Sequence, residues 1–468
     1  MPYDGELANS GVVKRITQNP KVTAFLDGIE KRGRDDVSDN LVHITTDETS
    51  ASDWLPQYVI GIDGGLQQIP IETGFPGSEV CYNTVVSVLL QIADMAEEDA
   101  RSRPIPPKRF RELRKAQAID AVLPGSNIVY KGSNNPVYTF RKQFFETLGA
   151  NGVIVERESL LQTYERLQAR RIGSSTKPQP CPWGDSCAGK CDDIIPAYTK
   201  GVGEYKCTCD AKQSLFSTDG LRIHDSFNPH GESGRMFGEA QMAIEHLWLV
   251  NVIRALVGNK EADVLDEIAF VMDGPLRIDG RPAWLSQAMI NELQDLNAAT
   301  KAKGGKDLLI FGVEKSGAFV EHLHRLDARE DGGERLPRGW LFLLDNAYIR
   351  KYIAIGDRPY GEVTYYGRKF FYKNRTGALL CITVPFLNPG SEDRRQAVNS
   401  SLFPRLADIL SILDKLASAR YPDAIIPIIA AHAEAAIPLS QGKRVLEQLV
   451  REHLHPPKPH RRTISTSP

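Results

Sequence analysis

The sequence predicts an α/β fold, with a mixed β-sheet, helical additions and a cysteine-rich insertion. Two apolar runs end in an aspartate that a glycine follows at once, at Asp63 and at Asp273. Segments with helical periodicity alternate with such runs, which is typical of a sheet covered by helices. Because 468 residues exceed what one hydrophobic core usually supports, we expect a main domain that carries insertions.

Composition restricts the possible partners and the compartment. With 57 basic and 59 acidic residues, any nucleic-acid surface must be a local patch rather than a global field. No run reaches the ~20 apolar residues that cross a bilayer, and the first residues lack the apolar core of a signal peptide. We therefore expect a cytoplasmic protein.

Clusters of Gly, Pro, Ser and Asn divide the chain. The expected parts are an N-terminal helical and polar segment at 1–54, the first part of the α/β core with a helical insertion at 55–175, a cysteine-rich insertion at 176–232, the second part of the core with C-terminal helices at 233–454, and a disordered basic tail at 455–468.

Each part contains segments with a recognisable period. Residues 58–92 predict a three-stranded antiparallel meander, whose first strand ends in a tight turn at Asp63-Gly64-Gly65. Further strands are expected at 268–276 and 307–317 and in a late hairpin of 363–373 and 378–386. Helical patterns cover 106–120, 137–148, 154–171, 235–258, 284–300, 402–417, 424–435 and 440–453.

The two aspartates at the ends of apolar strands suggest a metal site. A meander whose first strand ends in Asp, followed by α/β alternation, is typical of an RNase H-like core, in which neighbouring strand ends place carboxylates side by side. Carboxylates at Asp63 and Asp273 could hold two divalent ions ~4 Å apart, as in phosphodiesterases, and Mg²⁺ or Mn²⁺ suits oxygen ligands. The alternative is two Asp-Gly turns, but their joint occurrence on apolar strands favours the metal site.

Two helical residues could add ligands. Glu245 lies in the largely apolar stretch MAIEHLWLV, where an unpaired buried carboxylate would be costly; a narrow polar stripe with His246 or Asn251 is an equal alternative. Glu239 is a fallback ligand and is expected to be solvated. His432 lies in the Ala-rich helix IIPIIAAHAEAAIP, where a lone His is more often a core residue than a ligand.

Two further polar residues follow apolar runs. Lys315 precedes a glycine in FGVEKSG, from where its ammonium group could reach a phosphate. Asp345, in FLLDNAYI, is another carboxylate behind a strand, but we prefer a surface residue or a helix N-cap there.

The segment YYGRKFFYK combines basic and aromatic side chains at strand alternation. Such a combination suits a path for single-stranded DNA, because bases stack on aromatic rings and cations neutralise phosphates. The candidate residues are Tyr366, Arg368 and Lys369. A half-buried hairpin with an ordinary polar face is a nearly even alternative.

Five thiols within 29 residues suggest a small structural zinc site in a reducing compartment. They are Cys181, Cys187, Cys191, Cys207 and Cys209. Their spacing lacks the C-x2-C pair that marks zinc strongly, so the signal is moderate. His224 is an alternative fourth ligand.

Several motifs, in their order along residues 55–450, resemble those of bacterial NurA-domain nucleases. They are VIGIDGG, STDGLRIHDSF, AFVMDGPL, LLIFGVEKSG, LLDNAYI, YGRKFFYK and PIIAAHAEAAI. The resemblance implies an RNase H-like fold related to the Piwi domain of Argonautes, a homodimer, and Mn²⁺-dependent nuclease activity on DNA with 5′-to-3′ polarity. It also implies a partner, the hexameric HerA translocase, which feeds DNA to the nuclease in repair or in defence against phage.

The resemblance assigns roles residue by residue. The family's first Asp falls on Asp63, its helical Glu on Glu245, its second Asp on Asp273 and its C-terminal His on His432. The family often has a Tyr a fixed step before that His, and Tyr421 lies slightly too far away to match it. The cysteine-rich insertion is absent from archaeal members, so the resemblance assigns it no role.

These observations predict a two-metal deoxyribonuclease, in which the two aspartates, Glu245 and His432 hold Mn²⁺ or Mg²⁺ and Lys315 steadies the phosphate. The chief alternative is a catalytically inactive RNase H-like adaptor that regulates a DNA translocase by binding alone. RNA-guided cleavage by analogy with Piwi is weaker, because no segment suggests binding of a guide end.

Overall fold

A computed structural model of the protein describes residues 11–29, 51–71, 78–92, 114–154, 156–171, 181–183, 202–207, 212–258, 262–329, 331–393, 400–418, 421, 423–436 and 441–454. The chain forms two compact units, Met1–Thr45 and Thr46–Pro468. The first contributes helices α1 (Gly11–Thr17) and α2 (Pro20–Gly28), neither of which has a buried residue. Helix α2 starts at Asn19, whose side chain accepts a hydrogen bond from the Lys21 N–H.

The second unit is built on one mixed sheet of eight strands in the order β3-β2-β1-β6-β7-β10-β9-β8. Strands β1, β2 and β3 form an antiparallel meander, β6 and β7 continue the sheet parallel to β1, and β10, β9 and β8 are antiparallel to their neighbours. The strands are β1 (Tyr58–Pro70), β2 (Glu79–Gln91), β3 (Arg114–Pro124), β6 (Ile268–Asp273), β7 (Leu309–Glu314), β8 (Trp340–Leu343), β9 (Gly367–Lys373) and β10 (Leu379–Pro385).

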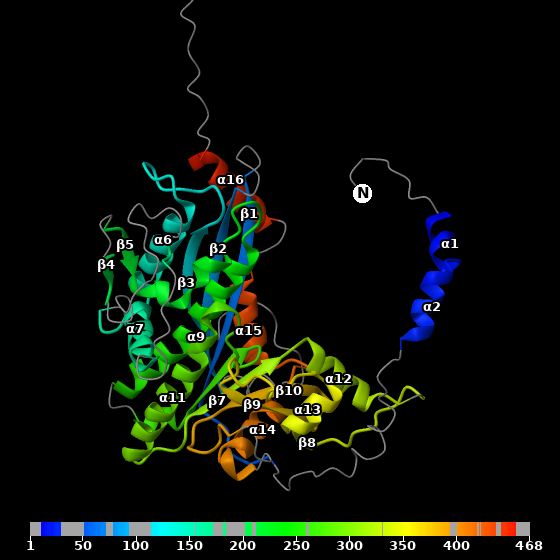
Figure 1. Ribbon diagram of the computed structural model, residues 1–468. Helices are drawn as coiled ribbons and strands as arrows, with labels where there is room; N and C mark the ends of the chain where they lie inside the picture. The colour runs from blue at the N-terminus through cyan, green and yellow to red at the C-terminus, as the bar shows by residue number, and fades with distance from the viewer. Residues whose placement is uncertain are drawn as a thin grey trace, which may run out of the picture. The chain divides into compact units, whose positions relative to one another are not determined.

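Helices cover both faces of this sheet, and for this reason its central strands are apolar on both sides. All six residues of β7 and all seven of β10 are buried. Helices α6, α7, α9 and α11 pack together on one side, whereas α15 lies on the other side of β1 (Figure 1). The helices of this unit are α6 (Pro136–Ala150), α7 (Leu160–Arg171), α9 (Gly234–Gly258), α10 (Ala262–Leu265), α11 (Leu285–Ala302), α12 (Ala318–Asp327), α13 (Asn346–Tyr352), α14 (Leu406–Lys415), α15 (Ile426–Ala435) and α16 (Gln441–Leu454).

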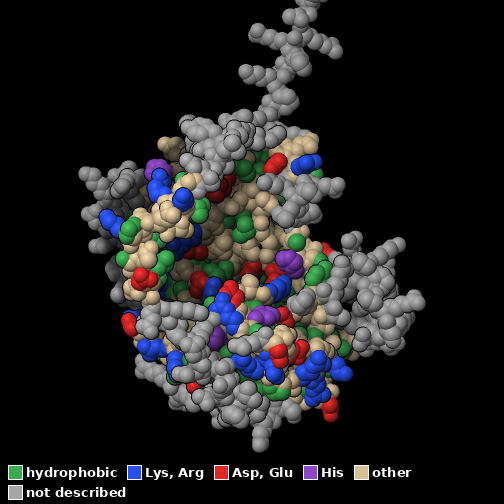
Figure 2. All heavy atoms as spheres, turned by 90° about the vertical axis from the view of Figure 1, so that its right-hand side faces the viewer, with side chains coloured by type: hydrophobic (Ala, Val, Ile, Leu, Met, Phe, Trp, Pro, Cys, Tyr) green, Lys and Arg blue, Asp and Glu red, His purple; other side chains and the backbone are tan. Residues whose placement is uncertain are grey.

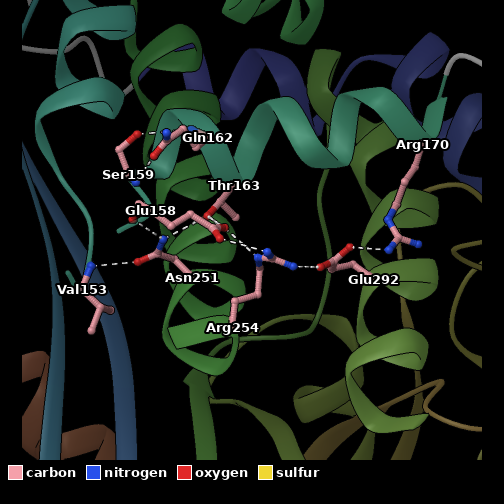
Figure 3. A network of polar contacts seen from close by, with 9 residues as sticks. All are labelled: Val153, Glu158, Ser159, Gln162, Thr163, Arg170, Asn251, Arg254 and Glu292. Atoms are coloured by element: carbon pink, nitrogen blue, oxygen red, sulfur yellow. Dashed lines mark hydrogen bonds and ion pairs between the residues drawn. The ribbon is translucent and has the colours of Figure 1, made fainter. Parts of the chain in front are cut away.

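A polar network connects the helices that cover the first face (Figure 3). The Arg254 guanidinium on α9 donates to both carboxylate oxygens of Glu158 and to Glu292 on α11. Glu292 also pairs with Arg170 of α7, at 2.7 Å. Asn251, one turn before Arg254, accepts from the Val153 N–H and donates to the Glu158 carbonyl. The network therefore fixes α7, α9 and α11 relative to one another.

Most of the expected elements are present, including the mixed α/β sheet, the strands at Asp273 and Lys315, the late hairpin and the three C-terminal helices. The N-terminal part of the sheet differs from the prediction. Strand β1 does not end at Asp63 but continues through the two glycines to Pro70, and the third strand of the meander is β3. The helix expected at 106–120 is wrong for residues 114–120, which pair with β2. The predicted tail at 455–468 lies outside the described residues.

The cysteine-rich part contains a small sheet of β4 (Glu204–Lys206) and β5 (Ser214–Phe216). Two 3-10 helices, η2 (Ser217–Leu221) and η3 (Ile223–Ser226), follow it and lead towards α9. The Arg141 guanidinium on α6 anchors this part through a buried ion pair with Asp219, at 2.5 Å.

No helix in the described ranges combines the length and the hydrophobicity that crossing a bilayer requires.

Candidate metal centre

Asp63 and Asp273 lie on neighbouring parallel strands. Ile62 is the last residue of β1 that pairs with β6, opposite Met272, so each aspartate is the next residue on its strand. Gly274 follows Asp273 with φ 93°, a conformation that favours glycine, and turns the chain away after β6. The prediction that strand pairing places these two carboxylates side by side is confirmed, although only Asp273 stands at a strand end.

His432 reaches the same place from helix α15. Its Nδ1 atom lies 2.9 Å from Asp63 Oδ2. Asp63, Asp273 and His432 can each offer one ligand atom such that all three atoms lie within 4.8 Å of one another. The imidazole is 61% exposed, whereas the Asp63 side chain is 9% exposed. The alternative of His432 as a buried core residue is therefore wrong.

Two glycines after Asp63 allow helices to approach β1 from both faces. A Cβ atom on Gly64 would lie 2.0 Å from Glu245 Oε1 of α9, and one on Gly65 would lie 2.3 Å from the Ala435 carbonyl oxygen of α15. Any side chain at either position would push the helix or its carboxyl group away. The Gly-Gly pair that the sequence suggested as a turn thus makes room for Glu245 of α9 on one face of β1 and for α15 on the other.

Glu245 is held by a residue that sequence reasoning did not single out. Gln241, one turn earlier on α9, donates from Nε2 to Glu245 Oε1 at 2.8 Å. The pattern could have indicated it, because residues four positions apart lie on the same face of a helix. The suggested polar stripe with Glu245 is not formed. His246 forms hydrogen bonds with Tyr366 and the Arg277 carbonyl. Asn251 forms hydrogen bonds with Val153, Glu158 and Thr163.

Lys315 supplies the positive charge of the site. It follows β7, and its Nζ lies 2.6 Å from Asp273 Oδ2. The side chain is exposed, so the ammonium group can turn towards a ligand while Asp273 keeps it near the cluster.

The acidic groups repel one another. Burial and the charge of Asp273 raise the pKa of Asp63 from 3.8 to about 7, against the opposing effect of the hydrogen bond from His432. Loss of solvation, with the charges of Asp63 and Asp273 as smaller causes, raises the pKa of Glu245 from 4.5 to about 8. The single positive charge of Lys315 thus compensates the negative charge of the three carboxyl groups only in part. A bound cation would therefore be stabilised at this site.

The donors fit a divalent cation. Two carboxylates and an imidazole converge within ligand distance of one another, and a third carboxyl group that lacks full solvation stands behind Gly64. Oxygen ligands favour Mg²⁺ or Mn²⁺, and the imidazole favours a transition ion such as Mn²⁺ over Mg²⁺. The residues that would hold the cation are Asp63, Asp273 and His432, with Glu245 beside them.

The side chains predicted to bind nucleic acid lie inside the protein. All seven residues of β9 are buried. The Tyr366 hydroxyl bonds His246 Nδ1 at 2.6 Å, Arg368 donates to the Asp393 carbonyl, and Lys369 pairs with Glu314. Both faces of the hairpin are covered, so the expected half-exposed alternation is wrong. Binding of nucleic acid by these residues stays a prediction that their burial does not support.

Two other acidic candidates have structural roles. Glu239, expected to be solvated, is buried and accepts from Ser226 Oγ at 2.8 Å and from Arg235 Nε at 3.1 Å. Asp345 caps helix α13, because its side chain accepts from the Tyr348 N–H at 2.6 Å. The N-cap interpretation of Asp345 is therefore confirmed.

Two of the five clustered cysteines lie in the described part of the chain. Cys181 packs against a small cluster that contains buried Cys207, together with Leu215 and Trp183. Cys187, Cys191 and Cys209 lie outside the described residues. His224 is buried beside Asp225, and burial lowers its pKa to about 4. Zinc binding by the cysteines stays a prediction.

The side of the second unit that carries α15 and α12 is hollowed (Figure 2). The back of the hollow is largely backbone and uncharged polar groups, and acidic, basic and histidine side chains gather in and below it. A ligand of some length could therefore enter from this side.

Comparison with known proteins gives two similar solved structures. One is the NurA nuclease from Sulfolobus solfataricus, at 11% identity and a TM-score of 0.27, covering 96% of this chain and 98% of that one. The other is a crystal structure of NurA, at 10% identity and a TM-score of 0.27, covering 95% and 98%. No family model and no curated protein matches the chain. Because both TM-scores are 0.27, these similarities carry no argument about the activity of this chain.

Proposed function

We propose that the protein is a metal-dependent deoxyribonuclease that hydrolyses phosphodiester bonds at the cluster of Asp63, Asp273 and His432. The convergence of these three side chains, from a central strand, its parallel neighbour and a distant helix, is the observation that supports it most. The raised pKa values of Asp63 and Glu245, beside the exposed Lys315, suit a polyanionic substrate that brings its own charge to a bound cation.

Each residue has a distinct task. Asp63 and Asp273 supply carboxylate ligands, His432 supplies a nitrogen ligand, and Glu245 adds a fourth group once it is ionised. Lys315, freed from Asp273, donates to a non-bridging oxygen of the phosphate and stabilises charge that develops there. When bound, divalent cations polarise a phosphoryl oxygen and make water easier to deprotonate. Gln241 keeps Glu245 oriented towards the gap left by Gly64.

The finer assignments rest on the sequence motifs that resemble NurA-domain nucleases. We place the sheet in the RNase H-like class, which the antiparallel β1-β2-β3 meander beside parallel β6 and β7 supports. DNA is the substrate, Mn²⁺ or Mg²⁺ the catalytic cation, and zinc a structural ion at the cysteines. A HerA-type hexameric ATPase, with a homodimer of this chain, delivers DNA ends in repair or in defence against phage.

A cleavage assay tests the proposal. DNA with labelled ends is incubated with Mn²⁺ and the parent protein, Asp63→Ala, or Asp331→Ala as a control on an exposed loop. We expect cleavage by the parent and the control and a loss of at least ~100-fold in Asp63→Ala, whose fold is checked by circular dichroism. Absence of cleavage by the parent, even with a HerA-type ATPase present, would support the inactive adaptor instead.

A further inference from the structure

Beyond the candidate metal site, one edge of strand β1 pairs with no strand among the described residues. Antiparallel pairing with β2 covers the whole strand, from Tyr58 to Pro70, but parallel pairing with β6 ends at Ile62. The chain after β6 turns towards β9 instead of continuing beside β1, because the Tyr366 N–H donates to the Leu276 carbonyl. In Figure 1, β1 and β2 run on together towards α16, away from β7 and β9.

The hydrogen bonds at the two ends of β1 show which main-chain groups face this edge. The Ile92 N–H donates to the Gln57 carbonyl, and the Ile71 N–H donates to the Ser78 carbonyl. Main-chain groups of odd-numbered residues therefore face β2, and those of even-numbered residues face the other side. The hydrogen bond of the Tyr58 N–H is consistent with this assignment, because the N–H donates to the Glu267 carbonyl just before β6.

Two main-chain donors consequently line the edge next to the cluster. The Gly64 N–H is taken by Asp63 Oδ1, at 2.7 Å, and Pro70 has no N–H. Among the described residues, the N–H groups of Leu66 and Gln68 face no strand. They are spaced by two residues, ~6.7 Å along the strand.

We propose that this edge binds the sugar–phosphate backbone of the substrate beside the bond that is cut, through the N–H groups of Leu66 and Gln68. The proposal rests on the proposed nuclease function. Sheet edges with free N–H groups form anion-binding sites, and no acidic side chain follows Asp63 on β1. The carbonyl groups of Gly64, Leu66 and Gln68 face the same edge. That of Gln68 already accepts from Gln67 Nε2 at 3.0 Å, and the phosphates would have to lie opposite the two N–H groups.

The exposed side chain beside this edge is apolar. Leu66, 39% exposed, offers an apolar surface to a sugar, whereas Glu245 and the Ala435 carbonyl fill the space on the two faces of β1 at Gly64 and Gly65. Two free donors lie between the Gly64 N–H, which Asp63 Oδ1 occupies, and Pro70, and such an edge is short for pairing with a protein strand. The edge begins at the residue after Asp63, so the backbone of a nucleic acid bound at the cluster would lie beside it.

Leu66→Pro tests the proposal, since proline removes the N–H that faces the edge and leaves the β2 side of the ladder intact. Binding of a labelled single-stranded oligonucleotide is measured by fluorescence anisotropy with Ca²⁺ in place of Mn²⁺. Leu66→Ala keeps the N–H and is the matched control. We expect about 10-fold to 100-fold weaker binding by Leu66→Pro and less than about 3-fold change in Leu66→Ala.

A substrate-side experiment does not depend on the folding of a variant. Single phosphates are replaced by neutral methylphosphonates along the oligonucleotide, and binding to the parent protein is measured. Replacement of one phosphate next to the cleaved bond should weaken binding to the parent protein by about 10-fold or more. The same replacement should have little further effect on binding to Leu66→Pro. A scan in which no linkage matters, or equal binding by Leu66→Pro and Leu66→Ala, would overturn the proposal.

Other occupants and a failure of the nuclease function give different results. A change of oligomeric state in Leu66→Pro, seen by light scattering, with unchanged oligonucleotide affinity would mean that the edge binds protein, and the proposal would be wrong. Parent protein that binds the oligonucleotide and loses binding in Leu66→Pro, but does not cleave with Mn²⁺, would overturn the nuclease function and support the edge. Cleavage by the parent protein, together with equal oligonucleotide binding by the parent and Leu66→Pro, would support the nuclease function and overturn the proposal for the edge.

Discussion

His432 Nδ1 and Asp63 Oδ2 lie 2.9 Å apart, although 369 positions separate the two residues in the chain. The contact joins an exposed imidazole on α15 to a buried carboxylate in the middle of β1. It places a nitrogen donor at the surface of a cluster whose oxygen donors lie deeper. A cation would therefore meet His432 first when it enters from solvent.

His432→Ala should weaken Mn²⁺ binding without changing the fold. The side chain is exposed, so the free energy of unfolding without metal should change by less than ~0.5 kcal/mol. Loss of a ligand should lower Mn²⁺ affinity at least ~10-fold, measured by isothermal titration calorimetry. Glu434→Gln, on the same exposed stretch of α15, is the control and should bind Mn²⁺ like the parent. Equal affinity in both variants would remove His432 from the site.

Stability without metal should fall as pH rises from about 5 to about 8. Asp63 and Glu245 have pKa values of about 7 and about 8 in the folded protein, against 3.8 and 4.5 in ordinary surroundings. The folded state therefore binds more protons than the unfolded state in this window, and each group contributes a loss of at most ~1.4 kcal/mol per pH unit. The stability that the protonated forms provide is complete below about pH 4 and is lost as pH passes through 7 to 8.

Asp63→Asn isolates this effect from the other titrating groups. At pH 8 without metal, the variant should be more stable than the parent by roughly 1 to 4 kcal/mol, measured by urea denaturation. At pH 5 the difference should fall to about 1 to 2 kcal/mol, and it should nearly disappear only below about pH 4, where Asp63 is protonated in the folded and the unfolded protein. Saturating Mn²⁺ should stabilise the parent at pH 8 but not the variant. A pH-independent difference would contradict the buried-charge explanation.

Gly64→Ala should disrupt the site through its effect on Glu245. The added methyl group would lie 2.0 Å from Glu245 Oε1 and 2.7 Å from Gln241 Nε2, so both side chains must move. We expect Mn²⁺ affinity and cleavage rate to fall at least ~10-fold, with a stability loss of ~1 to 3 kcal/mol. Gly238→Ala on α9 is the matched control, since a Cβ there contacts nothing within 4 Å and should stabilise the helix by ~1 kcal/mol. If Gly64→Ala retains full activity, Glu245 does not act at the cluster.

Arg254→Met should lower stability while Mn²⁺ affinity stays constant. The substitution leaves Glu158 without its bidentate partner and Glu292, 2% exposed, with Arg170 alone. Because partly buried carboxylates then lack a compensating charge, the free energy of unfolding should fall by about 3 kcal/mol, measured by thermal or urea denaturation. Arg325→Met, which removes an exposed pair with Glu321, should cost less than ~1 kcal/mol. An equal effect of the two variants would show that the network in Figure 3 adds nothing to stability.

The aspartates could be found from the sequence, but the conformation around Asp63 could not. Asp-Gly-Gly after an apolar run usually ends a strand, because glycine favours turns. Here the glycines are required by the approach of α9 and α15, which contact the strand from residues 180 or more positions away. Local sequence carries no information on such contacts. At Asp273 the same local rule is right, since Gly274 does turn the chain.

Two other errors have a similar physical origin. The stretch RKAQAIDA, within β3, has charged and alanine residues that favour helices, yet pairing with β2 determines its conformation. The alternation in β9 predicted one solvent-facing side, but neighbouring elements bury both, and its basic residues pair with Glu314 and the Asp393 carbonyl. In both cases tertiary packing overrides a local preference, whereas the long apolar helix α9 agrees with its prediction.

The separation of His432 from the two aspartates along the chain also affects when the site can form. A ribosome releases β1 and β6 before it reaches α15, so a nascent chain has Asp63 and Asp273 but no imidazole to complete the cluster. Under the proposed function, a copy that stops before α15 would lack the nitrogen ligand, and cleavage of DNA would begin only after α15 has been synthesised and folded.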